Sequence, residues 1–491
     1  MKAIRARAIF KAAIAGTLVV AWAVIGVATS TAATDRPAVE KPLNVLFILT
    51  EDQGPHMSVL GTPGLATPHM DALARRGMLF RNAHVVYPVC SASKAAIYTG
   101  LYCRTNGIRA NTLNYFKPAE AVTAAEKQHS LYRRLFIRDR YPTFVELLHD
   151  AGYFQGVTHK LHVLPNEKFP FDVWSKTADY RAATAFFQKA AAQGRPWFLM
   201  YNIPQSHRPF RNSDRVPIGV DPAAVDPPDW LPDTPVVRKD WAEYLDAVQR
   251  ADQAVGEVMR ALDESGMRDS TLVIFMGDHG PGFHRAKMAL YDSGTHVPLV
   301  IAGPGVAAGA CDALVSELDL MPTILEAAGI AVPGLQHGRS LWPLLQGKKD
   351  WEEAREYLAA EIHHQAQMHD RGMIEVAVFN DRYRLIHRSR TDGPRDVNAD
   401  LRDWKPWGNR SYDEVVARKD EFPWAYELLR QIDPARLGGT LPEWELYDRH
   451  EDPFELHNVA DEPAYRVVFE TMKDYWKQFE TDVPLRIDSA D

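Results

Sequence analysis

Short apolar runs alternate with longer amphipathic segments along most of the chain. Four runs have enough consecutive apolar side chains to predict buried strands of a parallel sheet: 42–50, 196–201, 271–276 and 297–302. Between the second and third runs, apolar residues recur on one face over about 239–264, which predicts a long helix. Another helix is expected to begin at Thr67-Pro68 and to end before Gly77. Strands that alternate with helices indicate a sheet covered on both faces.

The pattern changes after about residue 350. Residues 373–379 and 383–387 are typical of two adjacent strands joined by Asn380-Asp381, and a final helix is expected over 463–479. We therefore predict an α/β fold, with a large, mainly parallel sheet flanked by helices over residues 40–348. A smaller α+β domain with a small antiparallel sheet is predicted over residues 349–491.

The first 33 residues have the pattern of an export signal. Four basic residues precede an apolar run over 12–28 and a stretch of small residues over 29–33; they are Lys2, Arg5, Arg7 and Lys11. Because this order is that of a secretory signal peptide, we predict that residues 1–33 are removed and that the protein is periplasmic or extracellular. An uncleaved anchor is the alternative, although the run is slightly short for a membrane span. No other stretch of the sequence is apolar enough to cross a membrane.

Composition narrows the function classes. The chain has 491 residues, of which 46 % are hydrophobic and 24 % are charged, as in folded proteins. A net charge of −8 makes nucleic acid an unfavourable main partner. Three cysteines exclude a disulfide-dense framework. Two of them, Cys103 and Cys311, have no role assigned by the sequence, which leaves open whether they pair.

Acidic pairs follow two of the predicted strands. Glu51-Asp52 comes directly after the first strand, and Asp278-His279 comes directly after the third. Ligand sites of parallel sheets lie at the carboxyl ends of strands, so the two pairs are expected to converge on one divalent cation. Oxygen donors favour Ca²⁺ or Mg²⁺, and the histidine admits a transition metal. The alternative is that these acids cap helices.

Cys90 is expected at the N-terminus of a helix that ends near Gly100. The free N–H groups and the dipole of that terminus favour an anion, and Lys94, one turn further on, is placed to reach the same anion. A buried structural cysteine is the alternative.

Eight segments, in order, resemble the sequence blocks of type I sulfatases, a family of the alkaline phosphatase superfamily. Cys90, Ala92 and Lys94 align with its signature Cys-x-Pro/Ala-x-Arg, whose cysteine is oxidised to formylglycine. The other matching blocks are 50–54, 67–74, 159–162, 206–210, 277–280, 287–298 and 445–458. The likeness covers about 42–460. The heparan N-sulfatase (sulfamidase) branch looks nearest, because of the block at 159–163 and the pair His363-His364.

The resemblance implies a role for each matching residue. The cation, Ca²⁺ or another divalent ion, would be bound by Glu51, Asp52, Asp278, His279 and the modified Cys90. Lys94 and His162 would hold the formylglycine diol, which attacks sulfur. Lys160, His207 and Lys287 would contact the sulfate, and His207 or Lys287 would protonate the leaving group. His364 is expected to face the substrate or to be simply exposed. A formylglycine-generating or other maturation enzyme is the implied partner.

The chain departs from the family pattern at two positions, and three functions remain open. Lys94 stands where the signature has arginine, and Glu51 where the first metal block usually has aspartate. The first function is hydrolysis of a sulfate ester or sulfamate on a sulfated glycan or a small sulfate ester. The second is hydrolysis of phosphate or phosphonate esters. The third is glycan binding by an inactive sulfatase scaffold, which the lysine at position 94 keeps open.

Overall fold

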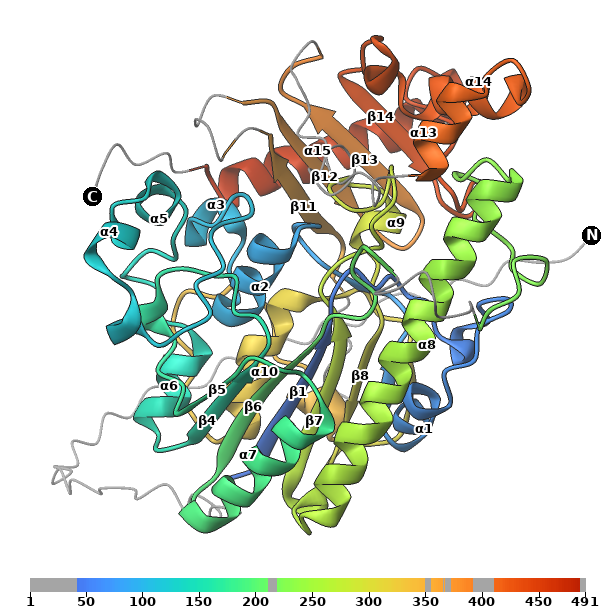
Figure 1. Cartoon of the computed structure of the whole chain (residues 1–491). Coiled ribbons are helices and arrows are strands. Elements are labelled where there is room, and N and C mark those ends of the chain that lie inside the picture. The colour runs from blue at the N-terminus through green and yellow to red at the C-terminus, as the bar shows by residue number, and fades with distance from the viewer. Residues whose placement is uncertain are drawn as a thin grey trace, which may run out of the picture. The chain divides into compact units, whose positions relative to one another are not determined.

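An eight-stranded sheet in the order β5-β4-β6-β1-β7-β8-β2-β9 forms the core of the structure (Figure 1). The computed structural model describes residues 42–210, 219–348, 355–364, 366, 372–391 and 410–485. The predicted signal peptide lies outside these residues, as does residue 349, the predicted start of the C-terminal domain. The strands are β1 Asn44–Thr50, β2 Met78–Phe80, β4 Phe154–Thr158, β5 Val173–Ser175, β6 Trp197–Ile203, β7 Thr271–Gly277, β8 Leu299–Ala302 and β9 Gly309–Cys311.

The mainly parallel sheet predicted from the sequence is confirmed, with one strand reversed. β5, β4, β6, β1 and β7 pair in parallel, whereas β8 is antiparallel to both β7 and β2. The sequence pattern of 297–302 does not reveal this direction, because a buried strand is apolar on both faces either way. An antiparallel neighbour needs no crossover to the opposite edge. Residues 278–298 can therefore stay at the carboxyl end of β7, where they include the short helix α9, Asp292–Thr295.

Helices cover both faces of this sheet, because the side chains of β1 alternate between two cores. Leu46 and Ile48 pack in the core that contains residues of α1, α7 and α8; Val45, Phe47 and Leu49 pack in the core of α2, α6 and α10. The helices are α1 Pro68–Arg76, α7 Tyr180–Gln193 and α8 Pro235–Glu264 on the first face, and α2 Cys90–Thr99, α6 Phe144–Asp150 and α10 Leu320–Ala327 on the second. Figure 1 shows α7 and α8 in front of the sheet and α10 behind it.

The C-terminal part contains a separate four-stranded antiparallel sheet in the order β11-β12-β13-β14. Its strands are β11 Leu358–His363, β12 Ile374–Phe379, β13 Tyr383–Arg388 and β14 Trp444–Asp448. The predicted hairpin is confirmed as β12-β13, and α15, Arg466–Asp482, packs against both strands. The shorter described elements are β3 Ala83–His84, α3 Cys103–Asn106, α4 Ala124–Lys127, α5 Ser130–Arg134, β10 Val315–Ser316, α11 Trp342–Leu345, α13 Arg410–Ala417 and α14 Pro423–Ile432.

Arg384 on β13 joins the C-terminal sheet to the segment that follows β7. Its Nε donates to Glu455 Oε1 at 2.7 Å, and its Nη1 donates to the Leu290 carbonyl oxygen at 2.9 Å. The other oxygen of Glu455 accepts the N–H of Asp292 at 2.7 Å. Arg384 and Glu455 are both buried, and their ion pair anchors the 290–292 segment to the C-terminal sheet.

We expect Arg384→Met to lower the free energy of unfolding by about 3–5 kcal/mol, because it removes the cation that is hydrogen-bonded to the buried carboxylate of Glu455 and leaves only Arg449, 3.8 Å away. Arg81→Met is the matched control. Arg81 binds Asp312 at 2.9 Å and both side chains are exposed, so its loss should cost under about 1 kcal/mol. Urea unfolding measures both. Equal losses would contradict the anchoring role of Arg384.

Candidate functional site

Four neighbouring parallel strands end at the same edge of the sheet, and the segment after each one carries predicted site residues. These strands are β4, β6, β1 and β7. Lys160 and His162 follow β4, and His207 follows β6. Glu51 and Asp52 follow β1, and Asp278 and His279 follow β7. The sheet therefore brings together residues that are more than 200 positions apart in the sequence.

Two hydrogen bonds from backbone N–H groups join the ends of β1 and β7. The N–H of Asp52 donates to Asp278 Oδ1 at 2.8 Å, and the N–H of Asp278 donates to the Thr50 carbonyl oxygen at 2.9 Å. Gly277 permits this approach: a Cβ there would lie 2.2 Å from the Gln53 carbonyl oxygen. The two acidic pairs are thus held against each other before any ligand binds.

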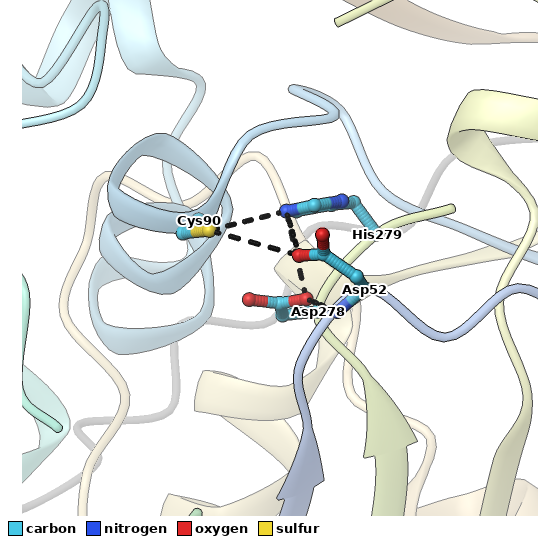
Figure 2. A group of neighbouring side chains, drawn as sticks. All are labelled: Asp52, Cys90, Asp278 and His279. Atoms are coloured by element: carbon cyan, nitrogen blue, oxygen red, sulfur yellow. Dashed lines mark hydrogen bonds and ion pairs between the residues drawn. The ribbon is translucent and has the colours of Figure 1, made fainter. Parts of the chain in front are cut away.

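Cys90 is the first residue of α2 and points at these strand ends (Figure 2). Its Sγ lies 3.3 Å from His279 Nε2 and 4.0 Å from Asp52 Oδ1. Burial alone would raise the pKa of the thiol, but the charges of Lys160, Lys287 and His279 and a hydrogen bond with His162 hold it well below its usual range. The helix terminus adds free N–H groups that favour an anion. Position 90 is therefore prepared for a negatively charged group.

Ser93 and Glu317 fix α2 against the end of β7, and the sequence analysis assigned neither of them to the site. Ser93 Oγ lies 2.6 Å from the Asp278 carbonyl oxygen and 2.6 Å from Glu317 Oε2. Glu317 Oε1 accepts the N–H of Val86 at 2.8 Å. The only sequence signal is the capping box that runs from Ser316 to Asp319, which predicts a turn and not a buried carboxylate beneath Cys90.

Four of the predicted ligands form a cluster that fits a divalent cation. Asp52, Cys90, Asp278 and His279 are buried, and their donor atoms lie within 4.8 Å of one another. Asp278 Oδ2 accepts no hydrogen bond from the described residues, and Lys94 Nζ lies 3.5 Å from it. Burial and the neighbouring Glu51 and Cys90 raise the pKa of Asp278 although His279 and Lys94 oppose the rise, so a further cation would favour its charged form. Two carboxylates and an imidazole are suitable donors for such an ion.

Glu51 is placed differently from the other predicted ligands. It lies outside the four-residue cluster, and its two oxygens contact the Nζ atoms of Lys94, at 2.6 Å, and Lys160. Lys287 is likewise paired, with Asp52 Oδ2 at 2.9 Å. All three predicted lysines are therefore held by strand-end carboxylates.

Two histidines lie beside these lysines. His207 Nε2 is 3.4 Å from Lys287 Nζ, and its Nδ1 lies 2.5 Å from the Arg208 carbonyl oxygen. Burial alone would lower the pKa of His207, but the carboxylate of Asp52 raises it to about 9. His162 Nε2 donates to the Thr112 carbonyl oxygen at 2.9 Å, while burial lowers the pKa of His162.

A cavity of about 470 Å³ opens above this group. Glu51, Lys160 and His207 line it, together with residues that the sequence analysis did not identify: Asn114, His159, Gln205, Arg208 and Arg250. A second cavity of about 510 Å³, between α1 and α8, has none of the predicted site residues in its lining. Three predicted site residues, Glu51, Lys160 and His207, therefore line the first cavity, and none lines the second.

The remaining predicted residues lie elsewhere or stay unpaired. His364 is buried at the end of β11, with Nε2 3.0 Å from Glu375 Oε1, and its contact with substrate stays a prediction. Cys103 and Cys311 are both free. Cys103 Sγ is buried and lies 3.3 Å from the Ala92 carbonyl oxygen.

Among the described residues, the helices include none with the length and apolar character of a membrane span.

Comparison with known proteins identifies the class. A family model described as "Sulfatase" matches residues 43–330, and one described as "N-sulphoglucosamine sulphohydrolase, C-terminal" matches residues 277–403. The chain belongs to the sulfatase family of hydrolases, which confirms the resemblance seen in its sequence blocks.

Particular relatives narrow the position within the family. Human N-sulphoglucosamine sulphohydrolase is 29 % identical over 90 % of this chain and 91 % of its own length. A solved 2-O GAG sulfatase superposes with a TM-score of 0.65 at 21 % identity, covering 92 % of this chain and 95 % of that one. A phosphonate monoester hydrolase of Agrobacterium radiobacter has the same TM-score at 17 % identity, covering 90 % and 96 %. Both solved structures share the fold of this chain.

We expect Ca²⁺ to raise the stability of the protein, because a cation that binds only the folded state at 100 times its Kd contributes about 2.7 kcal/mol. Asp278→Asn should remove most of this gain. Thermal unfolding in Ca²⁺ and in chelator measures the difference, with Glu120→Gln as a control at an exposed acid. An unchanged gain in Asp278→Asn would contradict the assignment of the cluster.

Proposed function

We propose that this protein hydrolyses the sulfate group of a sulfated carbohydrate, as a sulfate ester or a sulfamate. The observation that carries the proposal is the placement of Cys90 in a cluster of four donor residues that fits a cation, together with the cavity that Lys160 and His207 line. The similarity to human N-sulphoglucosamine sulphohydrolase over 90 % of the chain supports a sulfamate substrate.

We further propose that Cys90 is oxidised to formylglycine by a maturation enzyme. Its hydrate would supply one hydroxyl to attack sulfur and a second to release the sulfate afterwards, which a serine lacks. Lys94 and His162 would hold this hydrated side chain, since Lys94 lies one turn further along α2 and His162 contributes to the lowered pKa of the Cys90 thiol.

The cation would be held by Asp52, Asp278, His279 and position 90, and Ca²⁺ is our first choice for it. When bound, it would neutralise the charge of the sulfate oxygens and favour the anionic nucleophile. Lys160 and Lys287 would bind the remaining sulfate charge, and His207 would face the leaving group. Because its pKa is raised to about 9, His207 is protonated at neutral pH and suited to donate a proton.

The proposed setting is outside the cytoplasm. Residues 1–33 have the order of a secretory signal, so we propose a periplasmic or extracellular enzyme. We also propose that the catalytic domain ends at residue 348 and that the C-terminal domain begins at residue 349.

The substrate class is tested with the purified, Ca²⁺-loaded chain. We expect sulfate release from N-sulfoglucosamine or an O-sulfated glucosamine with a kcat/KM at least about 10²-fold above that for an aryl phosphonate or phosphate ester. Cys90→Ala is the control and should release no sulfate above background. A preference for the phosphorus esters would replace the proposal with the second hydrolase function. Glycan binding without turnover by wild type would support the inactive scaffold.

His207→Gln tests the proton donor. We expect kcat for the sugar sulfate to fall about 10²–10⁴-fold, the usual contribution of a positioned acid. Turnover of 4-nitrophenyl sulfate should fall far less, because a nitrophenolate leaves without a proton. Lys287→Met is the matched comparison and should slow both substrates. If Lys287→Met alone shows the dependence on the leaving group, the lysine is the donor.

A further inference from the structure

The two departures from the sulfatase sequence pattern contact each other. Glu51 is one methylene longer than the aspartate of the family block, and Lys94 replaces the arginine of the signature. In the structure, Lys94 Nζ donates to Glu51 Oε1 at 2.6 Å, and both side chains are 1 % exposed. A pair that is buried and in contact can compensate for changes that would each be harmful alone.

The polar atoms around Lys94 Nζ are arranged in a way that suits an ammonium group. Besides Glu51, its Nζ donates to Asn202 Oδ1 at 3.3 Å, and it lies 3.5 Å from Asp278 Oδ2 as an ion pair without a hydrogen bond. Asn202 is oriented by its Nδ2, which donates to the Thr158 and Lys160 carbonyl oxygens. An ammonium directs three hydrogens to separate acceptors around one point, whereas a guanidinium presents them in a plane.

The second oxygen of Glu51 binds Lys160, which lines the cavity. Glu51 Oε1 and Oε2 are thus each occupied by an ammonium, and the backbone carbonyl oxygen of Glu51 accepts from Ser206 Oγ at 2.6 Å. None of its atoms belongs to the cluster of four donors around position 90. In contrast, Asp52 combines its contact with Lys287 with membership of that cluster.

We propose that Glu51 is a positioning residue that holds Lys94 and Lys160, and that it does not bind the cation. Glu51 and Lys94 form one matched pair, and the cation is left to Asp52, Asp278, His279 and position 90. Since the two lysines act in sulfate hydrolysis, this assignment rests on the proposed function, but the first two measurements below use no substrate.

A crystal structure of the wild-type chain with Ca²⁺ tests the ligand set directly. Calcium–oxygen ligand distances are about 2.3–2.6 Å. We expect oxygens of Asp52 and Asp278 in that range, and Glu51 outside it and still paired with Lys94 and Lys160. A Glu51 oxygen within that range of the ion would overturn the assignment.

A charge-conserving double-mutant cycle tests the matching of the pair. The variants are Glu51→Asp, Lys94→Arg and the two combined, melted in chelator so that no metal contributes. We expect each single variant to melt several degrees below wild type and the double variant to recover most of the loss. Additive losses, or a double variant that fails to fold while the single variants fold, would show that the two residues are independent.

The same variants separate positioning from mere stability. Glu51→Asp should leave the Kd for Ca²⁺ within about threefold of wild type, whereas Asp278→Asn should weaken it at least about tenfold. With whichever sulfated substrate the wild type turns over, Glu51→Asp should lower kcat about tenfold, and Lys94→Arg should restore it in the double variant. A tenfold loss of Ca²⁺ affinity in Glu51→Asp would make it a ligand. A failure of the proposed function would abolish turnover but leave the distances and the melting cycle unchanged.

Discussion

Three buried carboxylates at one edge of a sheet repel one another, and the site depends on how that repulsion is neutralised. Glu51, Asp52 and Asp278 follow two adjacent strands, and each forms an ion pair with a lysine: Glu51 and Asp278 with Lys94, and Asp52 with Lys287. Buried like charges persist only when cations are placed among them. Lys94 and Lys160 neutralise Glu51, and Lys287 neutralises Asp52. Within the described part of the chain, Asp278 Oδ2 accepts no hydrogen bond, so a divalent cation beside it would complete the set.

The same constraint explains how an acidic protein can act on anions. The net charge of −8 gives no general attraction for a sulfated polymer, and electrostatic recognition must therefore be local. The carboxylates hold the three lysines, and Lys287 in turn contacts His207, so the carboxylates position cations that sulfate can bind. The acidic residues of the site thus position the basic side chains in and beside the cavity.

The sequence predicted the parts of this site that depend on local pattern. Apolar runs located β1, β6 and β7, and the acidic pairs after two of them were expected at one edge, where the structure places them. The reversed direction of β8 was not predictable, because the length of the 278–298 connection and the apolar run are compatible with both directions. The Lys94–Glu51 pair and the Ser93–Glu317 contact join residues more than 40 positions apart, so they depend on packing that no local pattern records. His364 shows the converse: its sequence position suggested substrate contact, but it is buried against Glu375 and its role stays a prediction.

The central claim is that position 90 carries the nucleophile as formylglycine. It is tested most directly by mass spectrometry of the peptide that contains Cys90, from protein made in its native host. The account predicts a peptide in which the cysteine sulfur is replaced by oxygen and two hydrogens are lost. A peptide with an unmodified, alkylatable Cys90 at full occupancy would contradict it, and would leave a cation site without this nucleophile.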